Sequence, residues 1–198
     1  MSTTNTLIDT AQMDAANIKT TATTNWVIEP NHSEIQFKVK HLMITTVTGS
    51  FNLFTASVQT ESEDFTKAKI SFSADVDSIS TGVADRDAHL KSADFFDVAK
   101  FPKLTFVATK TENVDNDGSY ELYGDLTMHG VTKNIKLDVE FGGVAKDPWG
   151  NTKAGFTISG KISRKDFGLV WNAPTETGGV LVSDEVRIAS EIQLLKQV

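Results

Sequence analysis

Hydrophobic and polar residues alternate with period two along most of the chain. In residues 33–41, Ile35, Phe37 and Val39 share one face, and charged or polar residues occupy the other. Such alternation is typical of a β-strand with one buried face. By the same parity, His41 falls on the apolar face.

The same pattern predicts further strands, separated by turn signals such as Asp115–Gly118 and Asp147–Gly150. Roughly eight strands joined by short turns predict an all-β fold, an antiparallel barrel or sandwich. The further alternating runs are residues 68–76, 104–108, 120–128, 135–141, 154–162 and 186–194.

One segment, residues 83–98, interrupts the alternation and has the composition of one or two short helices. Leu90, Phe95 and Phe96 make it too apolar for a free loop, so we expect it to pack on one end of the sheet as a cap. Extended chain resumes at Lys100-Phe101-Pro102.

The interior of an eight-stranded barrel is either filled by side chains or holds one small ligand. Alternation by itself favours a filled core, because most apolar faces are simply core. On this interpretation Trp26, Trp149 and Trp171 plug barrel ends or gaps.

Composition narrows the range of functions. The 198 residues are 39% hydrophobic and include no cysteine, which excludes disulfides, thiolate metal sites and cysteine nucleophiles. A net charge of -7 opposes nucleic acid and anionic membrane surfaces. Because of this charge we expect no nucleic-acid partner. No run of about 18 apolar residues occurs, so we expect no membrane span either.

Residues 1–25 contain eight Thr, three Asn and the single Lys19, so we expect a flexible extension before a folded domain at 26–198. This segment has no basic start and no long apolar run, so it does not resemble a secretory signal. The sequence as it stands therefore predicts a cytoplasmic protein, or a periplasmic one if a signal has been removed.

The sequence lacks the usual catalytic and nucleotide motifs, such as Gly-x-Ser-x-Gly and Gly-x-Gly-x-x-Gly. Asp85 and His89 have helical i,i+4 spacing and, with His41, suggest a metal-assisted enzyme. The simpler interpretation is a surface hydrogen bond, since a zinc site needs at least three protein ligands.

Two arginines lie beside acidic residues near boundaries between irregular and extended chain. Arg86 adjoins Asp85 and Asp87, and Arg164 precedes Asp166. They either form structural ion pairs that tie the insert to a strand end or anchor the anionic head group of a ligand.

A set of motifs resembles the YceI-like family, in the same order and over residues 26–198. They are Pro30-Asn31-His32-Ser33 with Ile35, Phe37, Lys40 and His41; Gly49 with Phe51; Ser78-Ile79 with Thr81; Arg86-Asp87 with His89-Leu90, Ser92 and Asp94–Asp97; Lys100-Phe101-Pro102 with Phe106; Gly124 with Leu126-Thr127 and Gly130–Lys133; and Arg164 with Asp166-Phe167-Gly168.

The resemblance implies an extended, eight-stranded, lipocalin-like antiparallel barrel with a short helical insert. It also reverses the expectation of a filled core. Members of this family hold a polyprenyl phosphate, a quinone with its prenyl tail or a fatty-acid derivative in the barrel, and many are periplasmic. The resemblance is compatible with a homodimer.

The resulting hypothesis is a non-catalytic carrier or sequestering protein for a long-chain amphiphile, with no cofactor other than the bound lipid or prenyl-quinone and with no metal. We expect residues 42–48 and 83–98 to act as lids. The alternatives are the metal-assisted enzyme and an interaction protein with a solid core. His41, Arg86 and Arg164 are the head-group candidates, and the predicted lining is Ile35, Phe37, Val39, Ile70, Phe72, Phe106, Leu122, Leu126, Met128, Phe156, Ile158, Phe167 and Leu169.

Overall fold

The computed structural model describes residues 23–61, 63–174 and 179–197, and these residues are mostly β-strand. They include one α-helix, α1 (Ala84–Lys91), and three short 3-10 helices, η1 (Pro30–His32), η2 (Val76–Ser78) and η3 (Arg164–Phe167). The strands are β1 (Thr23–Ile28), β2 (Glu34–His41), β3 (Thr45–Phe51), β4 (Phe54–Glu61), β5 (Asp64–Asp75), β6 (Ile79–Ser80), β7 (Lys103–Glu112), β8 (Tyr120–Met128), β9 (Val131–Lys146), β10 (Thr152–Ser163) and β11 (Val182–Lys196).

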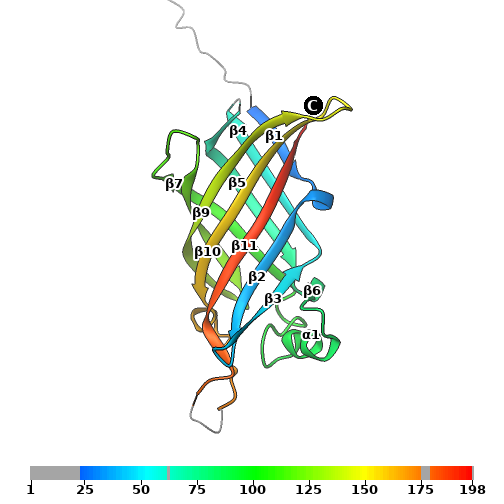
Figure 1. Cartoon of the computed structure of the whole chain (residues 1–198), viewed down its shortest axis with the longest axis vertical. Coiled ribbons are helices and arrows are strands. Elements are labelled where there is room, and N and C mark those ends of the chain that lie inside the picture. The colour runs from blue at the N-terminus through cyan, green and yellow to red at the C-terminus, as the bar shows by residue number, and fades with distance from the viewer. Residues whose placement is uncertain (1–22, 62, 175–178, 198) are drawn as a thin grey trace, which may run out of the picture.

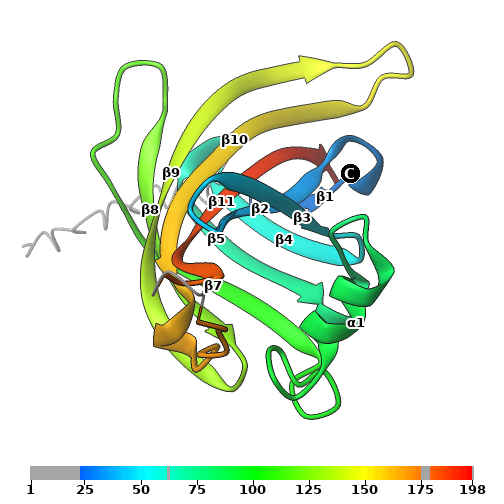
Figure 2. The same ribbon diagram turned by 60° about the horizontal axis from the view of Figure 1, so that its bottom comes forward.

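The strands close into an antiparallel barrel (Figures 1 and 2). One edge of β11 pairs with β10, and the other pairs first with β2 and then with β1. Thus β1 and β2 act as one strand interrupted at η1, and β3 and β4 likewise follow one another along the wall. Counted in this way the barrel has eight strands, which confirms the predicted fold class.

The structure changes two predicted boundaries. Thr23–Asn25, assigned to a flexible extension, belong to β1 and pair with Gln59–Glu61 of β4; residues 1–22 lie outside the described part of the chain. Thr45–Thr48, assigned to a lid, belong to β3 and pair with β2, so only 42–44 form the turn. Alternation is weak in both segments, because Thr is common on either face of a strand.

The insert packs against one end of the barrel, as predicted (Figure 1). Its helix α1 has acidic residues in the first turn and His89 and Lys91 in the last, an order that suits the helix dipole. Phe95 and Phe96 are buried, and the ring of Phe96 meets that of Phe51 edge-on at 6.2 Å.

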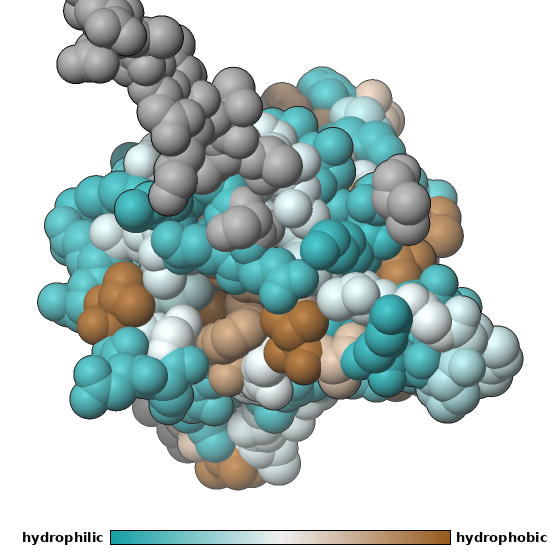
Figure 3. Space-filling model, turned by 90° about the horizontal axis from the view of Figure 1, so that it is seen from above, coloured by the Kyte–Doolittle hydropathy of each residue, from teal (hydrophilic) through white to brown (hydrophobic). Residues whose placement is uncertain are grey.

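The end of the barrel near β1 contains an aromatic cluster, and its surface is mostly hydrophilic with scattered apolar patches (Figure 3). Trp26 is fully buried, and its ring lies 5.0 Å from the tilted ring of Phe65. Its Nε1 donates to Thr60 Oγ1 at 3.1 Å. Trp26 therefore fills the barrel as predicted. The same prediction is wrong for Trp149, which is 83% exposed in the turn between β9 and β10.

We predict that Trp26→Ala lowers the free energy of unfolding by about 3–5 kcal/mol, because it leaves a large cavity and removes the hydrogen bond from Trp26 Nε1 to Thr60 Oγ1. Trp149→Ala, the matched control, should change it by less than about 0.5 kcal/mol. Urea denaturation of both variants checks this, and equal destabilisation would contradict the assignment of Trp26 as the plug.

Candidate functional site

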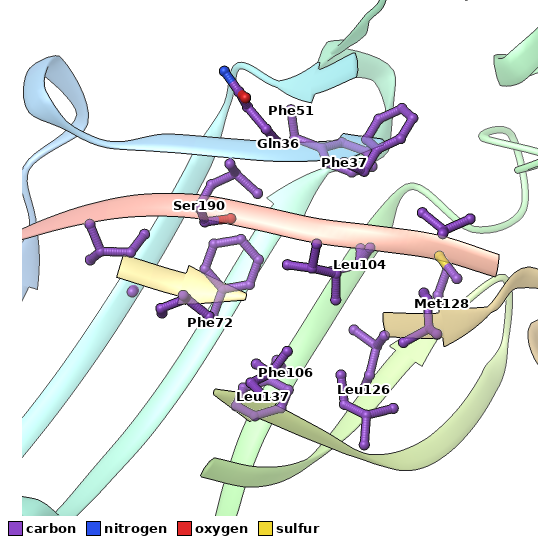
Figure 4. Close-up of a pocket in the computed structure, with 18 of the residues that line it drawn as sticks. Gln36, Phe37, Phe51, Phe72, Leu104, Phe106, Leu126, Met128, Leu137 and Ser190 are labelled. Atoms are coloured by element: carbon purple, nitrogen blue, oxygen red, sulfur yellow. The ribbon is translucent and has the colours of Figure 1, made fainter. Parts of the chain in front are cut away.

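The barrel encloses a cavity of about 250 Å³ whose lining is almost entirely apolar. Side chains from strands on all sides face one another across it (Figure 4). Among the described residues that line it, only Gln36, Tyr120, Arg164 and Ser190 carry polar groups. This hollow argues against the solid-core alternative, and an apolar lining of this kind suits an apolar ligand.

Most of the predicted lining residues do line the cavity. They come from five strands, from η3 and from the segment after it, so the structure brings together positions far apart in the chain. These residues are Ile35, Phe37, Val39, Ile70, Phe72, Phe106, Leu122, Leu126, Met128, Phe156, Ile158, Arg164 and Leu169.

Three predicted residues lie outside the lining. Phe167 is 1% exposed but belongs to η3, where the two-residue period of β10 ends and parity no longer indicates which way a side chain points. His41 ends β2 beside the 42–44 turn, beyond the cavity. Arg86 donates from Nε to Thr81 Oγ1 at 2.7 Å and from Nη2 to the Thr81 carbonyl at 2.9 Å, which ties α1 to the end of β6.

Arg164 lines the cavity, but its guanidinium donates hydrogen bonds to oxygens of the protein. It is 4% exposed and contacts Asp184 Oδ1 at 3.4 Å, so its ion-pair partner is not the neighbouring Asp166. Burial lowers the pKa of Arg164, and Asp184 opposes this change. Arg164 therefore holds the segment after η3 against β11. Its backbone acceptors are the carbonyls of Leu169, Trp171, Val182 and Ser183.

The structure does not assemble the predicted metal site. His89 Nε2 lies 3.1 Å from Asp94 Oδ2, and its ring meets Phe95 and Trp171 edge-on. Across the described residues, no three His, Asp or Glu side chains form a group that could hold a metal ion, so Asp85, His89 and His41 do not come together.

Several lining residues were absent from the predicted set. Leu104, Leu137 and Val139 lie on apolar faces of alternating strands, so parity could have found them. Gln36 could not be found in this way, because parity places it outside. The insert contributes Leu90, Phe95 and Phe96, whose apolar character predicted packing but not a particular neighbour.

Glycines on the inner face give large lining side chains room to lie against the wall. A Cβ on Gly124 would lie 2.2 Å from Phe106 Cζ, and one on Gly49 would lie 2.3 Å from Phe37 Cζ. These rings therefore occupy space that any other residue would fill, which keeps them out of the middle of the barrel.

The YceI-like domain model matches residues 26–194. The chain belongs to the YceI-like family. A UPF0312 protein of Staphylococcus aureus (strain MSSA476) is 37% identical over 171 residues, which are 86% of this chain and 96% of that protein. The YceI protein of Campylobacter jejuni, solved by crystallography, is 35% identical with a TM-score of 0.69, over 80% of this chain and 90% of that one.

Two more distant structures share the fold of this YceI-like protein. BcnA of Burkholderia cenocepacia has a TM-score of 0.70 at 22% identity, over 84% of this chain and 98% of that one. A polyisoprenoid binding domain from Saccharophagus degradans has a TM-score of 0.60 at 14% identity, over 87% of this chain and 98% of that one.

We predict that Gly124→Ala destabilises this YceI-like barrel by about 1–3 kcal/mol, because the new methyl group pushes the Phe106 ring into the cavity. Gly155→Ala is the control: a Cβ there meets nothing within 4 Å, so we expect no loss of stability. Chemical denaturation measures both, and equal losses would show that Phe106 does not depend on Gly124.

A second prediction concerns Tyr120 and the pH dependence of folding stability. Burial, with a contribution from Asp64, raises the pKa of this phenol from 10.0 to about 12. The unfolded chain therefore ionises first, so stability falls as the pH rises from about 10 to 12, by at most about 3 kcal/mol. Tyr120→Phe should remove this part of the alkaline loss in denaturation curves at each pH. Parallel losses in both proteins would contradict it.

Proposed function

We propose that this YceI-like protein binds a long-chain amphiphile of the isoprenoid or fatty-acid type in the barrel cavity and catalyses no reaction on it. The observation that carries this proposal is the nearly all-apolar lining of the barrel cavity. The polyisoprenoid binding domain from Saccharophagus degradans has the same fold, and its name agrees with a ligand of this class.

The hydrophobic effect accounts for the affinity without specific contacts to the tail. Each CH₂ moved from water into the cavity gains about 0.8 kcal/mol, so even a partly inserted tail binds measurably. We therefore expect the protein to accept tails of several chemical types. Prenyl-quinones, polyprenyl phosphates and fatty acids all meet this requirement.

The titratable groups in the lining support a non-catalytic role. Of the described lining residues, only Tyr120 and Arg164 titrate. Burial raises the pKa of Tyr120 to about 12, so its phenol stays protonated near neutral pH. The guanidinium of Arg164 stays charged and donates to carbonyl oxygens of the protein. General acid–base catalysis needs a group that exchanges a proton near the working pH.

We propose that the insert and the 42–44 turn act as lids over one end of the cavity. Leu90, Phe95 and Phe96 of the insert line the cavity, so moving the insert would open it. The described residues contain no helix long and apolar enough to cross a membrane. The cellular compartment and the homodimer stay predictions.

Ligand binding is tested by filling the cavity. We predict that Ile158→Trp abolishes or strongly reduces binding of geranylgeraniol and oleate, because the indole occupies the cavity, at a stability cost of about 1–3 kcal/mol. Ser159→Trp, the adjacent outward-facing position, should bind like the wild type. Native mass spectrometry after mild purification measures bound lipid in all three proteins.

Two results would overturn the proposal. One is a wild-type protein that carries no lipid after mild purification and takes up neither probe. The other is undiminished binding by a folded Ile158→Trp variant, since the ligand would then lie elsewhere.

A further inference from the structure

The barrel wall is incompletely paired between β5 and β7. Their ladder joins Ser71–Asp75 to Lys103–Val107 only. The first part of β5, residues 64–70, pairs with β4 on its other edge, and the last part of β7, residues 108–112, pairs with β8. We call the unpaired stretch the β5–β7 seam.

The local geometry explains the seam. The register between β7 and β8 shifts between Ala108 and Lys110, a bulge that bends β7 away from its neighbour. Across the seam, the Thr111 hydroxyl donates to the carbonyl of Thr66, a side-chain link in place of a backbone ladder.

A groove of about 680 Å³ lies over the seam and adjoins the barrel cavity. Ile70 and Leu122 line both spaces. The inner-face residues on either side of the seam are Ala68 and Ala108, which add little thickness to the wall. At this place, therefore, a few small and aliphatic side chains separate the apolar interior from the surface.

The rim of the groove is cationic and rich in hydroxyl groups. Lys67, Lys69 and Lys110 line it, and no acidic residue does, although the chain has a net charge of -7. Lys110 is engaged, since its Nζ lies 2.7 Å from Glu112 Oε1 and 4.4 Å from the centre of the Tyr123 ring. The hydroxyl and amide side chains of the groove are those of Ser57, Gln59, Thr66, Ser71, Thr109 and Thr111.

Lys67 and Lys69 form no ion pair with any described residue. Both are exposed on the outer face of β5, two residues apart. The nearby Asp64 accepts hydrogen bonds from Thr66 N at 3.0 Å and Thr66 Oγ1 at 2.6 Å, and it attracts Lys67 from beyond ion-pair distance. Two ammonium groups are thus available to an anion in the groove.

We propose that the β5–β7 seam binds the anionic head group, a phosphate, diphosphate or carboxylate, of an amphiphile whose tail lies in the barrel. This inference rests on the proposed function and specifies the class of ligand. The tail would pass between Ile70 and Leu122, and Lys67 and Lys69 would pair with the anion. The hydroxyl groups of Ser57 and Ser71 would donate to its oxygens, since those of Thr66, Thr109 and Thr111 already donate to protein oxygens. The arginines near the cavity do not compete for this role, because Arg86 and Arg164 donate to protein oxygens.

The test compares probes that differ only in the head group: geranylgeranyl monophosphate with geranylgeraniol, and oleate with oleyl alcohol. We expect wild-type protein to bind each anion about tenfold more tightly than its alcohol, as two exposed ion pairs allow. In Lys67→Gln/Lys69→Gln this preference should disappear, and the affinity for the alcohols should stay unchanged. Titration calorimetry measures all four affinities.

Two variants control for charge and for the fold. Lys38→Gln/Lys40→Gln removes the same charge at the same spacing from β2, where both lysines are exposed, and should keep the anion preference. Lys67→Arg/Lys69→Arg should keep it as well. Circular dichroism of each variant confirms that the barrel is folded.

The outcomes separate the two proposals. Equal wild-type affinities for anions and alcohols, or an equal loss in the β2 control, would overturn the seam as the head-group site and leave the cavity proposal intact. Failure of wild-type protein to bind any probe would overturn both. If Lys67→Gln/Lys69→Gln loses only the preference for geranylgeranyl monophosphate over geranylgeraniol, the seam is a phosphate site. If it also loses the preference for oleate over oleyl alcohol, the seam is a general anion site.

Discussion

The apolar faces of the strands are hidden from water only because the sheet closes on itself. Each strand has one apolar face, and a strand pair alone cannot hide such a face from water. When β1 and β2 pair with β11, all of these faces point to one interior, and no long sheet edge remains at that junction. The cavity is a product of this closure, because every strand of the described chain except β6 contributes to its lining.

Whether that interior is filled or hollow is decided by close contacts between neighbouring strands. Phe106 and Phe37 are large enough to fill the barrel, but each lies over a glycine of the next strand and so stays close to the wall. At the β1 end the opposite applies, because the rings of Trp26, Phe65 and Phe156 contact one another in tilted and edge-to-face arrangements and occupy the interior. The barrel is thus packed near one end and hollow elsewhere.

Polar groups in and around the interior serve mainly to hold the structure. Arg164 connects the segment after η3 to β11, Arg86 connects α1 to Thr81, and Trp26 connects β1 to Thr60. Since these groups are satisfied by the protein, the cavity offers a ligand little besides apolar surface. The proposed head-group site at the β5–β7 seam lies outside the cavity, where Lys67 and Lys69 form no ion pair with any described residue.

The pattern of residues was enough to predict the local features, namely the strands, the insert and most of the lining, because a strand turns successive side chains to opposite faces wherever it lies. The sequence motifs also indicated the YceI-like family, and this resemblance implied a closed barrel. Parity was not enough at Phe167, where a 3-10 helix changes the period, or at Gln36, which lines the cavity from a position that alternation places outside. Contacts between distant segments became visible only in the folded chain: Arg164 pairs with Asp184, Phe106 lies over Gly124, and β5 and β7 separate. These features depend on the register between separate strands, and alternation along one strand contains no information about register.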